Sequence, residues 1–193
     1  MNELSQTRTS DRPNLNNPSR LITRSFQQRS QPDWITNLFS SFLLDHLIMN
    51  AIAMIGKSLQ ADKRKVNITL EPNHESVVYA DQDMVYAIIY QLVTSAIGFS
   101  GADETVNISS QVFQNMVTIS ISSTGIGISP ERLHQLFQID TRPIRLSTID
   151  ELFTGFELLV CHRFTEKNRG KLSVLSGDTQ GKIFMLNLPK SLH

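Results

Sequence analysis

Hydrophobic residues recur at two different spacings along the chain, and these spacings predict the order of helices and strands. From Asp33 to about residue 58, apolar side chains return every three or four positions, which is the period of a helix with a buried face. The same period returns over 81–98 and 155–168. Alternation of apolar and polar residues, typical of half-buried strands, predicts strands at 66–71, 77–80, 106–110, 117–121, 171–176 and 182–188.

Turn residues join four of these strands into two hairpins. Gln114 and Asn115 separate the first pair, and 177–181 separates the second. Hairpins with helices between them predict an α+β fold, a two-layer α/β sandwich whose mixed, mostly antiparallel sheet packs on helices. A short helix is predicted from Ser129, which is followed by proline and an acid, and 138–153 is predicted to be a long loop.

The N-terminal part of the chain has a different composition. Residues 1–32 hold almost no apolar side chains and three prolines, so they are expected to form a disordered tail. The remaining residues, 33–193, are expected to form one domain. The predicted helix 34–58 has a wide apolar stripe, which leaves open a second use as a homodimer contact.

Charge and cysteine content exclude several classes of protein. The chain has 18 Lys+Arg and 18 Asp+Glu, and a balanced charge argues against nucleic-acid binding. The single cysteine, Cys161, excludes an internal disulfide and a cysteine-based zinc site, and no histidine spacing indicates another metal site. No apolar run reaches the roughly 18 residues that span a bilayer. We therefore expect a cytoplasmic protein with no metal centre and no membrane segment.

Four segments, in this order, resemble the sequence boxes of one family. Segment 80–100, which contains the predicted helix, is similar to an asparagine box, and 123–128 to a glycine box. Segments 136–142 and 153–158 are similar to a Phe/Arg box and a second glycine box. Together they resemble the ATP-binding domain of sensor histidine kinases, which shares the Bergerat-type fold with Hsp90-type chaperones, gyrase B and MutL.

The resemblance implies a set of nucleotide-pocket positions, and several hold residues that depart from the family pattern. The family places a magnesium-binding asparagine where this chain has Ser95, and an asparagine also where it has Gln91. Ser123 stands where the family has an aspartate that accepts the adenine amino group. Glu157 replaces a phosphate-facing glycine. The implied positions are Gln91, Ser95, Ser123, Gly125, Gly127, Arg142, Thr154, Gly155 and Glu157.

Each departure is expected to weaken nucleotide binding. Magnesium demands near-ideal octahedral geometry, so a missing ligand is not easily replaced. A neutral serine is a weaker acceptor than a carboxylate. A glutamate about 5 Å from a phosphate costs roughly 3 kcal/mol at an effective dielectric near 20. The sequence therefore predicts a degenerate member of the family with no catalytic residues and no bound cofactor.

Three functions remain open on these residues. The first is a non-catalytic signalling module that contacts a sensor kinase or a response regulator. The second is an ATP- and Mg²⁺-binding protein, either a histidine kinase fragment or a stand-alone serine kinase of the anti-sigma-factor type. The third is a phosphotransfer protein that uses His46, although the order Asp45-His46 is reversed from the family motif and no second hairpin helix is predicted.

Overall fold

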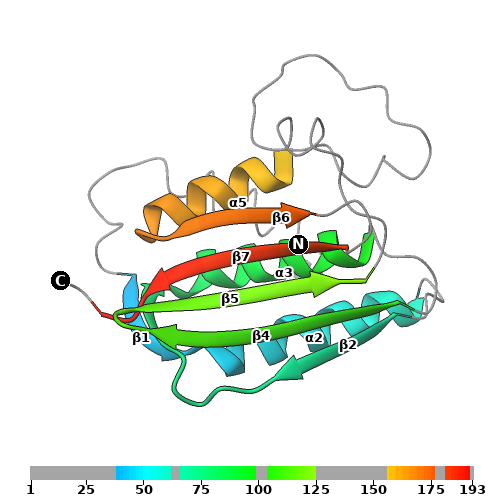
Figure 1. Ribbon diagram of the computed structural model, residues 1–193, viewed down its shortest axis with the longest axis horizontal. Helices are drawn as coiled ribbons and strands as arrows, with labels where there is room; N and C mark the ends of the chain where they lie inside the picture. The colour runs from blue at the N-terminus through cyan, green and yellow to red at the C-terminus, as the bar shows by residue number, and fades with distance from the viewer. Residues whose placement is uncertain (1–37, 62–65, 99–103, 125–155, 177–180, 192–193) are drawn as a thin grey trace, which may run out of the picture.

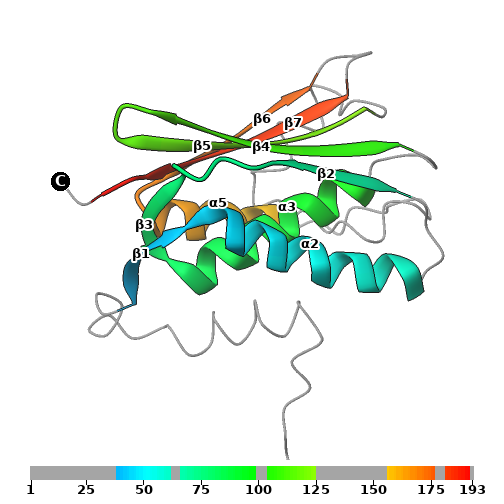
Figure 2. The same cartoon turned by 90° about the horizontal axis from the view of Figure 1, so that it is seen from below.

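A five-stranded sheet with three helices on one of its faces forms the body of the molecule. The computed structural model describes residues 38–61, 66–98, 104–124, 156–176 and 181–191. The helices α2 (Leu44–Ala61), α3 (Gln82–Gly98) and α5 (Phe156–Lys167) form the second layer, with α3 packed against both of the others (Figure 2). This is the predicted α+β sandwich.

The main sheet has the strand order β2-β4-β5-β7-β6. Only β2 and β4 run parallel, so the sheet is mixed and mostly antiparallel (Figure 1). Both predicted hairpins are confirmed, and Gln114 has the positive φ of 53° that a tight turn requires. The strands are β2 (Asn67–Glu71), β4 (Thr105–Phe113), β5 (Met116–Ser123), β6 (Lys171–Ser176) and β7 (Lys182–Pro189).

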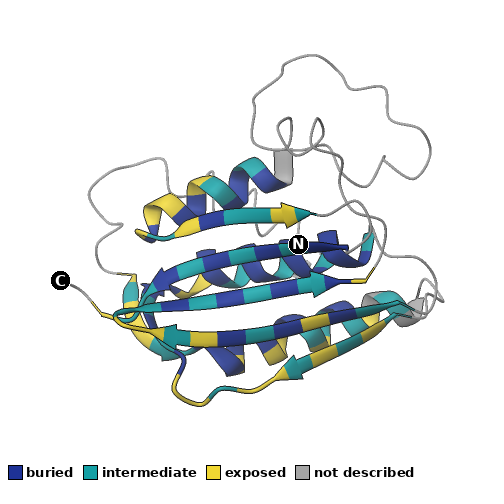
Figure 3. Ribbon diagram, in the orientation of Figure 1, coloured by how far each residue is buried: buried dark blue, intermediate teal, exposed yellow. Residues whose placement is uncertain are grey.

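The core lies between this sheet and the helices. Along β5 the side chains of Val117, Ile119 and Ile121 are fully buried, whereas the residues between them are only half-buried (Figure 3). Helix α3 is buried on most of its circumference because it is covered by the sheet and by both other helices. None of the helices in the described residues combines the length and apolarity needed to cross a bilayer.

The predicted helix 34–58 is wrong in its first part. Strand β1 (Phe39–Leu43) occupies that part, and it pairs antiparallel with β3 (Val77–Asp81) in a separate two-stranded sheet. The helix begins at Leu44, whose N–H donates to the carbonyl of Ser76 at 2.9 Å. The pairing with β3 satisfies the backbone of both strands, and this outweighs the helical spacing of Phe39 and Phe42.

Several predicted features cannot be compared with the structure. The tail 1–32, its boundary at residue 33, the short helix from Ser129 and the loop 138–153 lie outside the described residues. Of the proposed dimer helix 34–58, the structure describes the part from residue 38, and within that part the helix begins at Leu44.

Candidate functional site

The described part of the candidate site lies at one end of the molecule, where several elements meet. Helix α3 runs along β5 in contact with it, and both end on the same side of the molecule (Figure 1). Strand β7 begins at this end, beside the last residue of β5. The predicted positions Gln91, Ser95 and Ser123 are on these elements.

Two polar side chains fix the start of helix α3. The Oδ1 of Asp81 accepts the N–H of Met84 at 3.0 Å, which is an N-cap and confirms the predicted helix start. Asn168, just after α5, accepts the N–H of Asp81 at 2.7 Å and donates to the carbonyl of Phe164 at 2.8 Å. Asp81 and Asn168 are both buried. Their hydrogen bond therefore links the start of α3 to the end of α5 inside the molecule.

Ser95 lies in the interior of the molecule on α3. Its side chain is 0% exposed, and its hydroxyl donates to the carbonyl of Gln91, one turn earlier, at 2.7 Å. Such a bond is the usual way for a serine inside a helix to satisfy its hydroxyl. Thr94 does the same with Tyr90 at 2.8 Å, so Ser95 adopts an ordinary helical conformation.

Ser123 is the last residue of β5 and faces the helices. It is 3% exposed, and its Oγ has no hydrogen-bond partner among the described residues. On one side of it in the sheet lies Val106, and on the other lies Lys182. A buried hydroxyl without a partner is uncommon in folded proteins and is expected to have a reason.

Lys182 is a polar residue of this site that sequence analysis missed. It is the first residue of β7, it is 1% exposed, and burial lowers the pKa of its ammonium from 10.5 to about 8, while the charge of Glu104 acts in the opposite direction. The Oε2 of Glu104 is itself buried without a hydrogen-bond partner in the described part of the chain. The sequence contained a signal for its burial. Lys182 is two residues before Phe184 in a strand where Phe184, Leu186 and Leu188 face inwards, so alternation predicts that Lys182 faces inwards too.

The other predicted positions cannot be compared with the structure. Gly125, Gly127, Arg142, Thr154 and Gly155 lie outside the described residues. The backbone of Glu157 is in the first turn of α5, but its side chain is not described.

The histidine considered as a phosphoacceptor is exposed on α2, next to a buried acid. Asp45 is 2% exposed, and its Oδ2 accepts the N–H of Asn73 at 3.0 Å and lies 3.6 Å from Nδ1 of His74. Asp45 therefore anchors the loop before β3.

The described residues contain no cluster of three His, Cys, Asp or Glu side chains suited to a metal, and Cys161 is buried.

Sequence comparison finds relatives among bacterial sensor kinases. Sensor histidine kinase RppB of Synechocystis sp. (strain ATCC 27184 / PCC 6803 / Kazusa) is 25% identical over 88% of this chain and 36% of its own length. Sensor protein SrrB of Staphylococcus aureus (strain NCTC 8325 / PS 47) is 27% identical over 68% of this chain and 22% of its own length. The chain thus spans about a third or less of these curated relatives.

Structure comparison finds the same fold. Histidine kinase ThkA in complex with response regulator protein TrrA matches with a TM-score of 0.66 and 21% identity, over 90% of this chain and 48% of the other. Full-length ShkA in complex with AMPPNP matches with a TM-score of 0.65 and 15% identity, over 90% of this chain and 34% of the other. The profile of the family "Histidine kinase-, DNA gyrase B-, and HSP90-like ATPase" matches residues 80–192, more than half of the chain. The chain therefore belongs to the family of histidine kinase-, gyrase B- and Hsp90-like ATPases.

Proposed function

We propose that this chain is a non-catalytic signalling module of a two-component system. It retains the fold of a histidine kinase ATP-binding domain, has lost most or all binding of Mg-ATP, and regulates a sensor kinase or a response regulator by direct contact. The observation that carries the proposal is the register pair formed by Ser123 and Lys182 at the end of the sheet, because a buried serine stands where the family resemblance puts a carboxylate acceptor, and its partner on the next strand is a buried lysine.

The base-binding end of the site supports this proposal. An adenine amino group is a hydrogen-bond donor and needs an acceptor in the protein. Ser123 offers a neutral hydroxyl in place of a carboxylate, and the ammonium of Lys182 adds only donors to its neighbourhood. Charge-assisted bonds are roughly twice as strong as neutral ones, so the change at Ser123 weakens recognition of adenine.

The magnesium-binding position supports it as well. Ser95 would have to supply an oxygen in place of an asparagine amide, but its side chain is shorter and fully buried. Its hydroxyl proton is directed to the carbonyl of Gln91 within the same helix. Because magnesium is reluctant to lose water and demands octahedral geometry, the described residues do not fit this ion.

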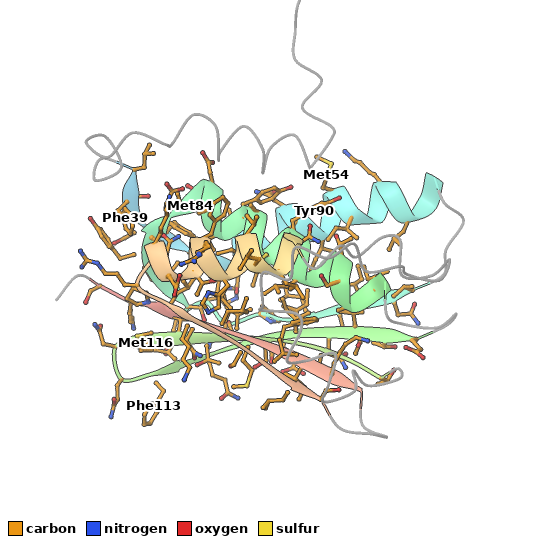
Figure 4. The ribbon with its side chains drawn as sticks, turned by 90° about the horizontal axis from the view of Figure 1, so that it is seen from above. Phe39, Met54, Met84, Tyr90, Phe113 and Met116 are labelled. Carbon is orange, nitrogen blue, oxygen red and sulfur yellow. The ribbon has the colours of Figure 1, made fainter. Side chains whose placement is uncertain are left out.

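The intact scaffold supports a role in protein contact. The core of the sandwich is continuous, and binding surfaces can persist when a site on the same fold has lost its chemistry. ThkA, a structural neighbour, forms a complex with a response regulator. At the β4–β5 hairpin, Phe113 is 71% exposed opposite Met116 and projects from the sheet on the side away from the helices (Figure 4), which makes this hairpin a candidate contact surface.

Titration of the purified chain with a fluorescent ATP analogue and Mg²⁺ tests the loss of nucleotide binding. Full-length ShkA, whose structure contains AMPPNP, is the positive control. We expect no saturable signal from this chain at concentrations that saturate the control. Saturable binding displaced by unlabelled Mg-ATP, with a Kd of tens of micromolar, would contradict the proposal.

The main rival is an ATP-binding protein, either a fragment of a sensor kinase or a stand-alone serine kinase. The rival is favoured by the curated relatives, which are named as a sensor histidine kinase and a sensor protein. The same titration separates the two functions.

Phosphotransfer through His46 is tested by incubating the chain and its His46→Ala variant with a phosphorylated partner, and we expect no phosphoryl group on either.

A further inference from the structure

The outer face of the main sheet, which is the face turned away from the helices, carries almost no charge. Inward and outward positions alternate along β4, β5 and β7, and the outward positions of these three central strands hold Ser, Thr, Asn, Gln and apolar residues but no charged residue. The described helices all lie on the opposite side of the sheet (Figure 2). Charged residues are the ones most often exposed to water, so a neutral outer face calls for a physical explanation.

Polar side chains of the outer face hydrogen-bond to one another across strands. Oγ1 of Thr118 on β5 donates to Oδ1 of Asn187 on β7 at 2.6 Å. Thr69 on β2 donates in the same way to Asn107 on β4. Polar groups that already have partners within the protein lose little when water is removed from them. The outer face is therefore suited to being covered by another neutral surface.

Apolar residues are exposed at both ends of the outer face. At the β4–β5 hairpin Phe113 is 71% exposed, opposite Met116. At the other end of the strands Leu175 on β6 is 54% exposed, opposite Ile183 on β7. Exposed apolar groups on a neutral surface are typical of a contact surface. Five strands of these lengths cover about 600 Å² at ordinary strand spacings, which is of the same order as the roughly 800 Å² that each partner buries in a standard interface.

The two charged residues among the outward positions of the five strands have opposite signs and lie on the two edge strands. Glu71 is on β2, and Lys171 is on β6. The register across the sheet places Glu71 level with Ser120 on β5 and with Ser173 on β6, two residues from Lys171. A two-fold axis along the central strand β5 superposes β2 of one copy on β6 of the other. Glu71 then lies about 7 Å along the strand from Lys171 of the second copy.

We propose that the outer face of the sheet binds a second copy of this chain, face to face, about a two-fold axis that runs along β5. The two sheets then pack as the layers of a sandwich. Glu71 of each copy faces Lys171 of the other, and Phe113 covers Pro189 because β4 lies over β7. A second copy fits this face because it offers the same neutral centre and the opposite charge at the matching edge. The inference goes beyond the proposed function and does not depend on Mg-ATP.

The first test is sedimentation velocity of the full chain at micromolar concentrations, where we expect a reversible dimer. Ser120 lies on the proposed axis, so Ser120→Lys and Ser120→Glu each place two like charges opposite each other and should weaken the dimer at least tenfold. An equimolar mixture of the two variants should restore a mixed dimer. Met49→Lys, at an exposed position of α2, is the control and should leave the dimer intact.

Three results would overturn the inference. They are an unmodified chain that stays monomeric, a dimer that survives in folded Ser120→Lys, and a dimer that Met49→Lys dissociates in its place. The last result would place the contact on α2. Circular dichroism confirms that each variant is folded.

The second test reverses the charges at the edges. Glu71→Lys should weaken the dimer by about three- to tenfold, because like charges then face each other at both edges. Adding Lys171→Glu to this variant should restore the dimer, and Glu75→Lys, an exposed residue outside the strands, is the control. A double variant that dimerises no better than Glu71→Lys would contradict the two-fold arrangement. None of these results affects the proposed function, which fails only if the unmodified chain binds Mg-ATP.

Discussion

Ser123 and Lys182 face each other across the β5–β7 ladder, both on the buried side of the sheet. One contributes a hydroxyl without a partner among the described residues, and the other a buried cation whose pKa is lowered to about 8. Burying a serine hydroxyl without a hydrogen bond costs folding free energy, and so does removing a charged ammonium from water. The pair should therefore affect stability in the absence of any ligand.

Replacing Lys182 by methionine should stabilise the protein at neutral pH. A fall in the pKa from 10.5 to about 8 sets an upper limit of roughly 3.4 kcal/mol on the destabilisation while the amine is charged in both states, and solvent screening of the ammonium reduces it. Removing the charge while keeping the side-chain volume should recover part of this, so we expect a gain of about 1–3 kcal/mol at pH 7, measured by urea denaturation.

The stabilisation expected from replacing Lys182 by methionine should shrink as the pH rises. Between about pH 8 and 10.5 the unfolded chain holds the Lys182 proton and the folded chain does not, so the stability of the unmodified protein increases with pH. Measurements should stop near pH 9.5, because burial raises the pKa of Tyr86 and Tyr90, and both would destabilise the fold at higher pH. If the advantage of the methionine variant stayed constant over this range, the buried charge of Lys182 would not be its cause.

A second prediction contrasts two glycines. A Cβ at Gly170 would lie 2.3 Å from the carbonyl oxygen of Asn187, a backbone atom that cannot move freely, whereas a Cβ at Gly56 in α2 would meet nothing within 4 Å. We expect Gly170→Ala to lower the free energy of unfolding by about 2–4 kcal/mol. Gly56→Ala should raise it by up to about 1 kcal/mol, because alanine is the better helix former. Thermal melts of both variants measure the contrast, and equal Tm values would be inconsistent with the described backbone.

A third prediction concerns the link between α5 and α3. Asn168→Ala removes the side-chain acceptor of the buried Asp81 N–H, which should cost about 1–3 kcal/mol. Asn50→Ala, at an exposed position of α2, is the control and should change stability by less than about 0.5 kcal/mol. Hydrogen exchange should also show faster opening at the start of α3 in the first variant alone. A variant as stable as the control would mean that α3 is positioned by other contacts.

Much of the fold could be predicted because its periodicities are regular. Alternation along 117–121 correctly indicated a half-buried strand, and Asp81 marked the start of a helix by its capping chemistry. The stretch 39–43 was predicted wrongly as helix. Phe39 and Phe42 fit a helical stripe, and only the pairing with a strand almost forty residues later shows that the segment is extended.

The candidate site was predictable only where a residue could be compared with a sequence box. Ser95 and Ser123 were identified in this way as departures. Lys182 belongs to none of the boxes used, and its importance arises from a register that places it beside Ser123. A strand pattern alone says that Lys182 faces inwards, but it cannot say which strand lies next to it.

The most direct measurement is an NMR titration of the isotope-labelled chain with Mg-ATP that follows the backbone amides of Ser95, Ser123 and Lys182. These residues come from the helix and the two strands that line the described part of the site. We expect their chemical shifts to stay unchanged up to millimolar Mg-ATP. Saturable shifts at all three, with a common Kd in the micromolar range, would show that the site still binds its nucleotide and would contradict a non-catalytic role based on a lost pocket.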